Sequence, residues 1–209
     1  MSESSLRRYT NLPATLHILQ KKSLTLLSPS SWDDRNDAYC LTEYKNRLKA
    51  GSVLALCFAE APQTYHHWRV FSPGSGGVCL EFDKDQLQEC VQDDPRFKCD
   101  SVIYRMINTV TTKGFKTDQL PFVKRFPYRD EKEFRILFVD MAENNEFKQL
   151  DIPLSFIKRI TLSPWMPKAL ATAVKSTLKS IKGCQKLRVY RSTLVENERW
   201  KHAVNLKRK

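Results

Sequence analysis

The sequence predicts a single α+β domain whose core is a mixed, mostly antiparallel sheet flanked by helices. The chain has 209 residues, of which 41% are hydrophobic, enough to bury one sizeable core. Its predicted strands are short, and helices interrupt them at irregular intervals, which is typical of α+β proteins and not of a regular β-α-β winding. No internal repeat is visible. We therefore expect one domain over residues 1–209.

The N-terminal quarter predicts two strands and two helices. In order, these elements are a strand at Leu6–Thr10, a helix from Pro13 to about Lys22, a strand at Leu24–Leu27, a turn over 28–34 and a helix over 35–50. Pro13 suits the first turn of a helix, where its missing N–H is not needed. Leu16 and Leu19 follow it at helical spacing. The turn over 28–34 is rich in Ser, Pro and Asp, which ends the second strand.

Two continuous apolar runs predict the central strands of the sheet. They cover Val53–Phe58 and Gly77–Phe82, and runs of this length without polar residues are typical of strands buried on both faces. Pro73–Gly77 supplies a flexible turn into the second run. Neither a Lys-Ser/Thr pair nor a helix follows these glycines, so a phosphate-binding loop is excluded. Asp83 is expected to cap a helix that runs to about Val91.

The second half of the chain predicts four strands, one helix and a long loop. The strands are at Val102–Tyr104, Glu133–Asp140, Ile157–Leu162 and Leu187–Tyr190, and the helix is at Pro167–Ile181. Gly183 is expected at the C′ position that ends this helix. Residues 108–127 have few periodic apolar positions, so we expect a long loop or an irregular helix there. Loops of that length in a compact domain are usually functional or disordered.

Charge is distributed unevenly along the chain. Residues 1–151 contain 21 Lys or Arg and 21 Asp or Glu, whereas residues 152–209 contain 14 and 2. Such a one-sided field attracts polyanions, of which nucleic acid is the commonest in a cytoplasm. We expect a nucleic-acid-binding surface within residues 152–199, followed by a basic, frayed tail over 200–209. Its candidate residues are Lys175, Lys179, Lys182, Lys186 and Arg188. The alternative is a solvated basic face that only keeps the protein soluble.

Cysteine and hydropathy patterns exclude several classes of protein. The six cysteines form no Cys-x-x-Cys pair, and the N-terminus predicts no signal region, so we expect reduced thiols and a cytoplasmic location. Cys and His residues also lack the short spacings of a metal site, and no metal is expected. The longest apolar runs are far shorter than the ~20 residues of a membrane helix. An integral membrane protein is therefore not expected.

Glu131 and Glu133 are the candidate catalytic residues. Two positions apart at the mouth of an apolar strand, their carboxylates would project from one face. Paired carboxylates raise each other's pKa, so that one can be ionised while the other is available for proton transfer. The alternative is an ordinary charged strand start, in which the carboxylates pair with Lys132 or Arg135.

Several stretches along nearly the whole chain carry a family resemblance. They are residues 6–12, 26–34 and 53–58, then His67–Phe71 with Gly76–Phe82, then Tyr128–Arg135, and finally 157–164 with 189–192. Together they resemble a bacterial domain-of-unknown-function family, number 2971. Tyr128–Arg135 is similar to that family's Trp-x-x-Glu-x-Glu-aromatic-Arg signature.

The order of these motifs is similar to that of ADP-ribosyltransferase-like folds, which place an early Arg or His on a first strand and a late Glu on another strand. The resemblance implies that Arg8 faces the pyrophosphate or the nicotinamide ribose of NAD, since a guanidinium suits phosphate oxygens. Glu133 would stabilise the oxocarbenium-like state, and Glu131 would orient or deprotonate the acceptor. Tyr9 and Trp68 would stack on nicotinamide or adenine, with a core role as the alternative for each.

The resemblance thus implies an ADP-ribosyltransferase-like enzyme that consumes NAD and modifies a nucleic acid or a nucleic-acid-bound protein. By analogy, a toxin or phage-defence role with an antitoxin or immunity partner would follow. Two other classes stay open. A non-enzymatic nucleic-acid-binding module needs only the C-terminal cations, and a magnesium-dependent nuclease would use Asp33, Asp34 and Glu131.

Overall fold

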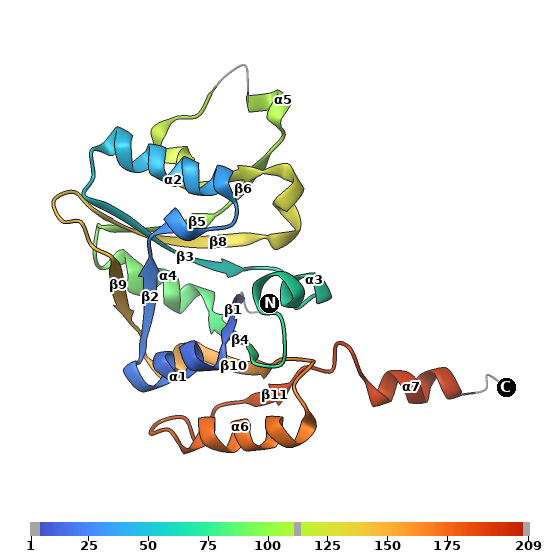
Figure 1. Cartoon of the computed structure of the whole chain (residues 1–209). Helices are drawn as coiled ribbons and strands as arrows, with labels where there is room; N and C mark the ends of the chain where they lie inside the picture. Colours follow the sequence, from blue (N-terminus) through green and yellow to red (C-terminus); the bar gives the residue numbers. More distant parts are fainter. Residues whose placement is uncertain (1–4, 111–113, 207–209) are drawn as a thin grey trace.

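A mixed β-sheet forms the centre of the molecule (Figure 1). The computed structural model describes residues 5–110 and 114–206, and nine strands of this part form the sheet. They are β1 (Ser5–Asn11), β2 (Ser23–Leu27), β3 (Ser52–Ala59), β4 (Gly77–Asp83), β5 (Phe97–Ser101), β8 (Glu133–Asp140), β9 (Phe147–Asp151), β10 (Ile157–Leu162) and β11 (Val189–Arg191). The main path is β11-β10-β4-β1-β3-β2-β9, and β8 pairs with β3 and β5.

Pairing within this sheet is antiparallel, apart from the parallel pair β10 and β11. The predicted α+β fold with a mixed, mostly antiparallel sheet in a single domain is confirmed. A small second sheet joins β6 (Ile103–Arg105) and β7 (Val123–Arg125) in parallel. β1 follows β4 along its whole length and meets β3 at Arg7, opposite Ala59.

Helices flank the sheet, and α1, α2, α4 and α6 correspond to the four helices predicted by residue pattern. They are α1 (Leu12–Lys21), α2 (Arg35–Leu48), α3 (Tyr65–Phe71), α4 (Lys84–Gln92), α5 (Ile107–Val110), α6 (Lys168–Ser180) and α7 (Glu198–Asn205), with 3-10 turns η1 (Pro29–Ser31), η2 (Thr117–Phe122), η3 (Phe126–Glu131) and η4 (Leu154–Phe156). Short polar side chains accept N–H bonds at the first turns, with Asn11 capping α1, Asp34 capping α2 and Asp83 capping α4.

Strand alternation divides the core into two layers. Leu54, Leu56 and Phe58 of β3 pack in the larger cluster, together with apolar side chains of α1, α4 and α6. Val53 and Ala55 point to the other face and pack in a smaller cluster with α2. β3 is therefore covered on both faces, as its continuous apolar run predicts.

β8 alternates in the same way, and this places the candidate site. Phe134, Ile136 and Phe138 belong to the larger cluster. Because successive side chains point to opposite faces, Glu133 and Arg135 project from the face that α2 covers. Arg135 of the fully buried strand β8 thus meets Asp37 in the first turn of α2, and Glu133 lies beside Arg135.

Several predicted details differ from the structure. The C-terminal tail is not frayed throughout, because α7 forms a helix that extends away from the body (Figure 1). Gly183 is not the C′ residue of α6, which ends at Ser180 with an extended C-cap at Ile181, although Gly183 does adopt a φ of 89°. Within the described residues, no helix is both long and apolar enough to cross a membrane.

Candidate active site

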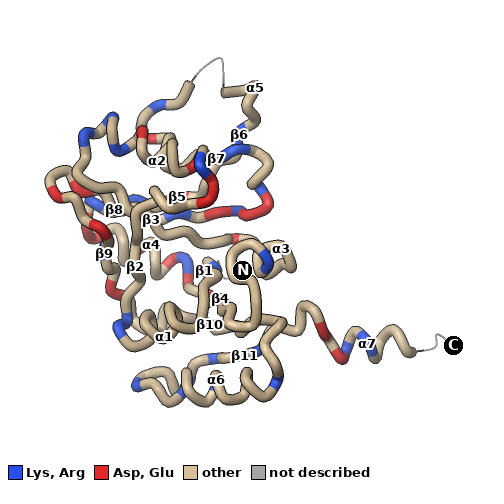
Figure 2. Tube along the Cα trace, viewed as in Figure 1, with Lys and Arg blue, Asp and Glu red and all other residues tan. Residues whose placement is uncertain are grey.

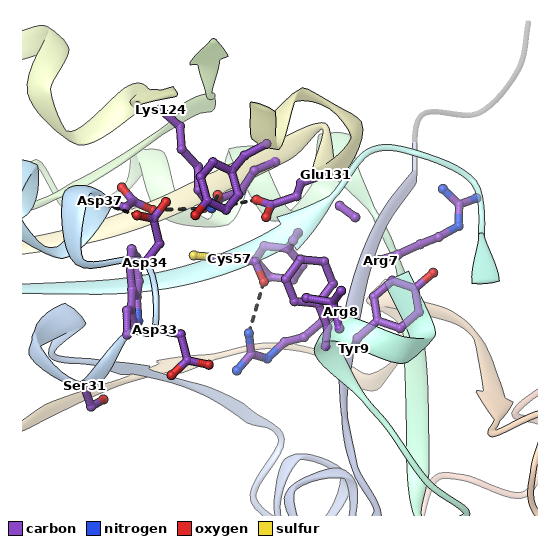
Figure 3. Close-up of a pocket in the computed structure, with 17 residues that line it drawn as sticks. Arg7, Arg8, Tyr9, Ser31, Asp33, Asp34, Asp37, Cys57, Lys124 and Glu131 are labelled. Atoms are coloured by element: carbon purple, nitrogen blue, oxygen red, sulfur yellow. Dashed lines mark hydrogen bonds and ion pairs between the residues drawn. The ribbon is translucent and has the colours of Figure 1, made fainter. Parts of the chain in front are cut away.

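A cavity of about 520 Å³ opens on the face of the sheet that α2 covers, beside the contact between β1 and β3 (Figure 3). Its walls come from β1, β3, the turn around η1, the end of α3 and the segment between Lys124 and Glu133. We call it the central cavity. Four of the five residues predicted for catalysis or NAD binding line it, namely Arg8, Tyr9, Glu131 and Glu133.

A cluster of five charged residues lies at one side of the central cavity, and four of them line it, with Arg135 buried behind them. The cluster consists of Asp37, Lys124, Glu131, Glu133 and Arg135. Arg135 is fully buried and makes two hydrogen bonds to Asp37, of 3.0 and 2.7 Å. Its Nε donates to Oε1 of Glu133 at 2.8 Å. Lys124 Nζ lies 2.6 Å from Glu131 and 3.3 Å from Glu133. Two cations thus hold three buried carboxylates.

The two glutamates of this charge cluster have pKa values shifted in opposite directions. Burial alone would raise the pKa of Glu133, but Arg135 and Lys124 hold it below its ordinary value. Burial raises the pKa of Glu131 above its ordinary value, although Lys124 opposes the shift. Neighbouring carboxyls whose environments separate their pKa values are suited to different roles in acid and base chemistry.

Glu131 and Glu133 meet for a different reason from the one predicted. Glu131 is not on the strand but ends the 3-10 turn η3, and Lys132 then adopts a left-handed conformation with φ 43° before β8 begins at Glu133. The prediction that both project from one strand face is therefore wrong. Lys124, from β7, brings the two carboxylates together.

The alternative interpretation of these glutamates, an ordinary charged strand start paired with Lys132 or Arg135, is met in part. Glu133 does pair with Arg135, at 2.7 Å. Glu131 pairs with Lys124 and not with Lys132. Burial separates this arrangement from an ordinary charged strand start, because the side chains of Glu133 and Arg135 are 6% and 0% exposed.

Arg8 faces the central cavity without a carboxylate partner among the described residues. One N–H of its guanidinium donates to the carbonyl of Cys57 at 3.1 Å. Burial lowers the pKa of Arg8, because removal from water disfavours the charged form. Its neighbour Arg7 differs, since it pairs with Glu81 at 3.4 Å and donates to the carbonyls of Glu60 and Ala61. An anion in the cavity would therefore stabilise Arg8 in particular.

Tyr9 lines the central cavity, whereas Trp68 does not. Trp68 is fully buried, donates its indole N–H to Gln63 at 3.3 Å and contacts Tyr9 edge to face. In this structure Trp68 is a core residue, and a ring stacked on a ligand would have to come from another position. Tyr9 also stacks on His67, with ring planes 9° apart.

The five predicted nucleic-acid-binding cations lie away from the central cavity. Lys175, Lys182, Lys186 and Arg188 are exposed and Lys179 is half-buried, and none lines the cavity. Figure 2 shows α6 and β11 at the opposite end of the molecule from α2 and β7. Buried side chains of α6 pack in the larger cluster, on the face of the sheet away from α2.

Part of the excess C-terminal charge is neutralised by acidic residues elsewhere. Lys158 pairs with Asp83 at 3.0 Å, and Arg159 pairs with Glu81 at 2.6 Å. Positive charge is therefore distributed more evenly over the folded molecule than along the sequence.

The residues of the predicted nuclease site, Asp33, Asp34 and Glu131, all line the central cavity. One Asp34 oxygen accepts the N–H groups of Asn36 and Asp37 as the helix cap, and Glu131 is bound to Lys124. In the described part of the chain, no three His, Cys, Asp or Glu side chains are grouped as metal ligands. Two of the three proposed ligands are thus engaged with the protein.

Comparisons with known proteins give a fold-level likeness. No protein-family model matches the sequence, and a search of curated proteins finds no match. Solved structures of DarT from Thermus sp. 2.9 are similar in shape. One, in complex with ADP-ribosylated ssDNA, is 13% identical, with a TM-score of 0.48, covering 92% of this chain and 95% of that chain. A second, in complex with NAD+, is 13% identical, with a TM-score of 0.47 and coverage of 92% and 96%. At these values the likeness assigns no family and no activity to this chain.

Proposed function

We propose that this protein is an ADP-ribosyltransferase that binds NAD in the central cavity and transfers ADP-ribose to a nucleic acid or a nucleic-acid-associated acceptor. One observation carries the proposal. A guanidinium without a carboxylate partner in the described chain and two carboxyls with oppositely shifted pKa values face the same cavity. A cavity of about 520 Å³ also lies within the range of small-molecule sites.

Arg8 is the candidate for the pyrophosphate of NAD. A guanidinium has five N–H donors, and one of those of Arg8 is used by the Cys57 carbonyl. The others are available to phosphate oxygens, which a guanidinium binds through two parallel hydrogen bonds. The order of motifs along the sequence, with an early Arg and a late Glu, agrees with this assignment.

Glu133 is the candidate for the ribose end of NAD. When the bond between C1′ and the nicotinamide nitrogen breaks, its electron pair leaves with nicotinamide and positive charge develops on the ribose. Because its pKa is lowered, Glu133 is ionised at neutral pH and stabilises that charge. A lone pair of the acceptor then forms the new bond to C1′. Glu131, whose pKa is raised, accepts the proton that the acceptor loses in this step.

Aromatic side chains supply apolar walls for a nicotinamide or adenine ring. Tyr9, Trp32, Phe58, Phe71 and Tyr128 all line the central cavity. These rings take over the stacking role that the sequence assigns to Trp68. The Cζ atom of Arg135 lies over the Trp32 ring, 4.9 Å from the ring centroid, so this aromatic wall contacts the charge cluster.

The proposal is tested by incubating the protein with labelled NAD, total RNA, DNA and cell extract, and by measuring nicotinamide release and label transfer. We expect transfer by the wild type and a loss of at least 100-fold in Glu133→Gln, consistent with the electrostatic stabilisation of a developing charge. Glu89→Gln is the matched control, because Glu89 is exposed on α4 and does not line the cavity. Equal transfer by Glu133→Gln and the wild type would sink the catalytic role of Glu133.

The same samples separate the two other candidate functions. Degradation of the nucleic acid that stops in chelator, without nicotinamide release, would favour the magnesium-dependent nuclease. Salt-sensitive nucleic-acid binding without either reaction would favour the non-enzymatic binding module. A toxin or phage-defence role requires transfer inside the cell, and it predicts growth arrest on induced expression of the wild type but not of Glu133→Gln.

A further inference from the structure

We propose that the acceptor is a single-stranded nucleic acid, and that a second cavity beside the central one holds its phosphates and one unpaired base. This cavity, which we call the arginine cleft, has Arg35, Arg105 and Arg125 on its walls with Tyr39 and Ile107. The role of the bound strand as an acceptor rests on the proposed function, whereas binding of the strand can be measured without NAD.

The arginine cleft adjoins the candidate active site. It has a volume of about 430 Å³ and lies between α2, α5 and the small sheet of β6 and β7. Asp34, Asp37 and Lys124 line both this cleft and the central cavity. One layer of side chains therefore separates the two cavities, and Lys124, which binds Glu131, belongs to that layer.

Three cations converge on the arginine cleft. Arg105 and Arg125 are register partners on the parallel strands β6 and β7, so their side chains leave the small sheet on the same face. Arg35 is the first residue of α2, where the helix dipole already makes the potential positive. In the part of the chain that the structure describes, none of the three is within 4.0 Å of a carboxylate. Mutual repulsion of this kind is relieved by a bound polyanion.

Part of the remaining wall of the arginine cleft is aromatic or aliphatic, as a stacking surface for a base requires. Tyr39 is 64% exposed and Ile107 is 63% exposed, and Val110, Phe115 and Val123 also contribute to the apolar part of the lining. Aromatic and apolar side chains stack on bases of any nucleotide sequence. A base can enter such a cleft only when it is unpaired, so the cleft favours single strands over a duplex.

The charge count along the sequence conceals this surface. Residues 1–151 are neutral in total, yet three of their carboxylates, those of Asp37, Glu131 and Glu133, are buried against Lys124 and Arg135. Lys124 and Arg135 therefore offset much of the negative charge of these acids. The arginine cleft therefore attracts phosphates next to the candidate catalytic residues, which the distant lysines of α6 do not.

Binding of fluorescent oligonucleotides of about 12 nucleotides, within the range of single-strand site sizes, tests the inference in the absence of NAD. Single-stranded DNA, single-stranded RNA and a duplex of the same sequence are titrated at several salt concentrations. We expect the double variant Arg105→Gln, Arg125→Gln to weaken single-strand binding at least tenfold and to reduce the salt slope by roughly 1.4, or about 0.7 for each lost phosphate contact. The DNA and RNA arms identify the kind of strand.

The matched control is the double variant Lys175→Gln, Lys179→Gln, which removes the same charge from α6. We expect this control to change single-strand affinity less than threefold. A larger loss in the α6 variant than in the arginine variant would overturn the inference, and so would duplex binding as tight as single-strand binding. Absence of binding by the wild type to any of the three oligonucleotides would overturn it as well.

Tyr39→Ala tests the stacked base separately from the phosphates. Loss of one stacked base costs about 1–3 kcal/mol, so single-strand affinity should fall roughly 5-fold to 150-fold while the salt slope stays unchanged. An unchanged affinity of Tyr39→Ala would show that no base stacks on Tyr39 in the arginine cleft. Nicotinamide release by the wild type distinguishes this inference from the proposed function. Single-strand binding through the cleft with no such release would leave the binding surface standing and refute the transferase.

Discussion

Arg135 stabilises the fold and the candidate site at the same time. It is fully buried, binds both oxygens of Asp37, and donates to Glu133 and to the carbonyl of Pro121. Replacement by Leu would leave the two carboxylates buried without their main counter-charge. We expect Arg135→Leu to lower the free energy of unfolding by about 3–5 kcal/mol, measured by urea denaturation.

Arg96→Leu is the matched control for this prediction. Arg96 also makes a short ion pair, 2.8 Å from Asp94, but its side chain is 50% exposed. Exposed ion pairs contribute far less to stability than buried ones, because water and salt screen them, so the control should be close to the wild type. Equal losses in the two variants would show that burial of the charge cluster does not determine its contribution.

At the scale of residues, the sequence predicted the candidate site in part. Glu131 and Glu133 were selected from their spacing and Arg8 and Tyr9 from the family resemblance, and all four line one cavity. Lys124 and Asp37 were not selected, although they connect the site. Lys124 lies in the segment 108–127, where weak periodicity gives no strand signal, and its role depends on contacts with distant residues. A Lys shortly before a signature with two Glu residues is a weak signal for it, because Arg125 and Arg129 stand in the same stretch.

The turn between α3 and β4 packs closely against the end of α3, and a substitution at Gly77 tests this contact. A Cβ at Gly77 would lie 2.7 Å from the backbone oxygen of Ser72, whereas a Cβ at Gly76 would meet no atom within 4 Å. Ser72 also donates a hydrogen bond to the Thr10 carbonyl of β1. We expect Gly77→Ala to lower the thermal midpoint, with a cost of about 1–3 kcal/mol.

Gly76→Ala, at the neighbouring position, is the control and should stay within about 0.5 kcal/mol of the wild type, as for an exposed substitution. Similar midpoints for the two variants would contradict the close approach of Ser72 to β4. A shift in Gly77→Ala alone would show that this turn fixes the end of α3 against β1, next to the central cavity.

At the scale of elements, apolar patterning predicted the interior of the sheet better than its margins. β3, β4 and β8 were predicted because their apolar runs are continuous. β5 and β9 were missed because Phe97–Ser101 and Phe147–Asp151 are polar and partly exposed. Such strands exist because a buried neighbour supplies hydrogen bonds, with β8 beside β5 and β2 beside β9. That information is tertiary and is not present in the local sequence.

For the whole molecule, buried thiols and phenols predict loss of stability at alkaline pH. Burial raises the pKa of Cys79 from 9.0 to about 12, and the pKa of Tyr104 is raised for the same reason. The folded state binds these protons more tightly than the unfolded state. The contribution of Cys79 is therefore complete below about pH 9 and falls as the pH rises towards 12, whereas that of Tyr104 begins to fall only above about pH 10. Each loss amounts to about 1.4 kcal/mol per pH unit.

Urea unfolding between pH 8 and pH 10.5 measures this loss. Cys79→Ala should start from a lower stability at pH 8, because a buried side chain is shortened, but its stability should fall less steeply with pH. An equal slope in the variant and the wild type would show that Cys79 does not titrate with unfolding.

The overall charge of the molecule shows why function is harder to predict than fold. The total of +12 and its C-terminal excess are visible in the sequence, but the ion pairs that neutralise Lys158 and Arg159 join residues some 75 positions apart. Which cations remain free is a property of the folded surface. Lys175 and its neighbours remain candidates for nucleic-acid binding, and Arg105 with Arg125 forms a rival surface that the charge count does not reveal.

Titration of the protein with a hydrolysis-resistant NAD analogue tests the central claim most directly. We expect the wild type to bind and Arg8→Gln to bind at least tenfold more weakly, because hydrogen bonds to a charged group contribute about 1.5–3 kcal/mol. Arg199→Gln, which removes an exposed arginine of α7, should match the wild type. Absence of binding by the wild type, or equal binding by Arg8→Gln, would contradict the assignment of the central cavity to NAD.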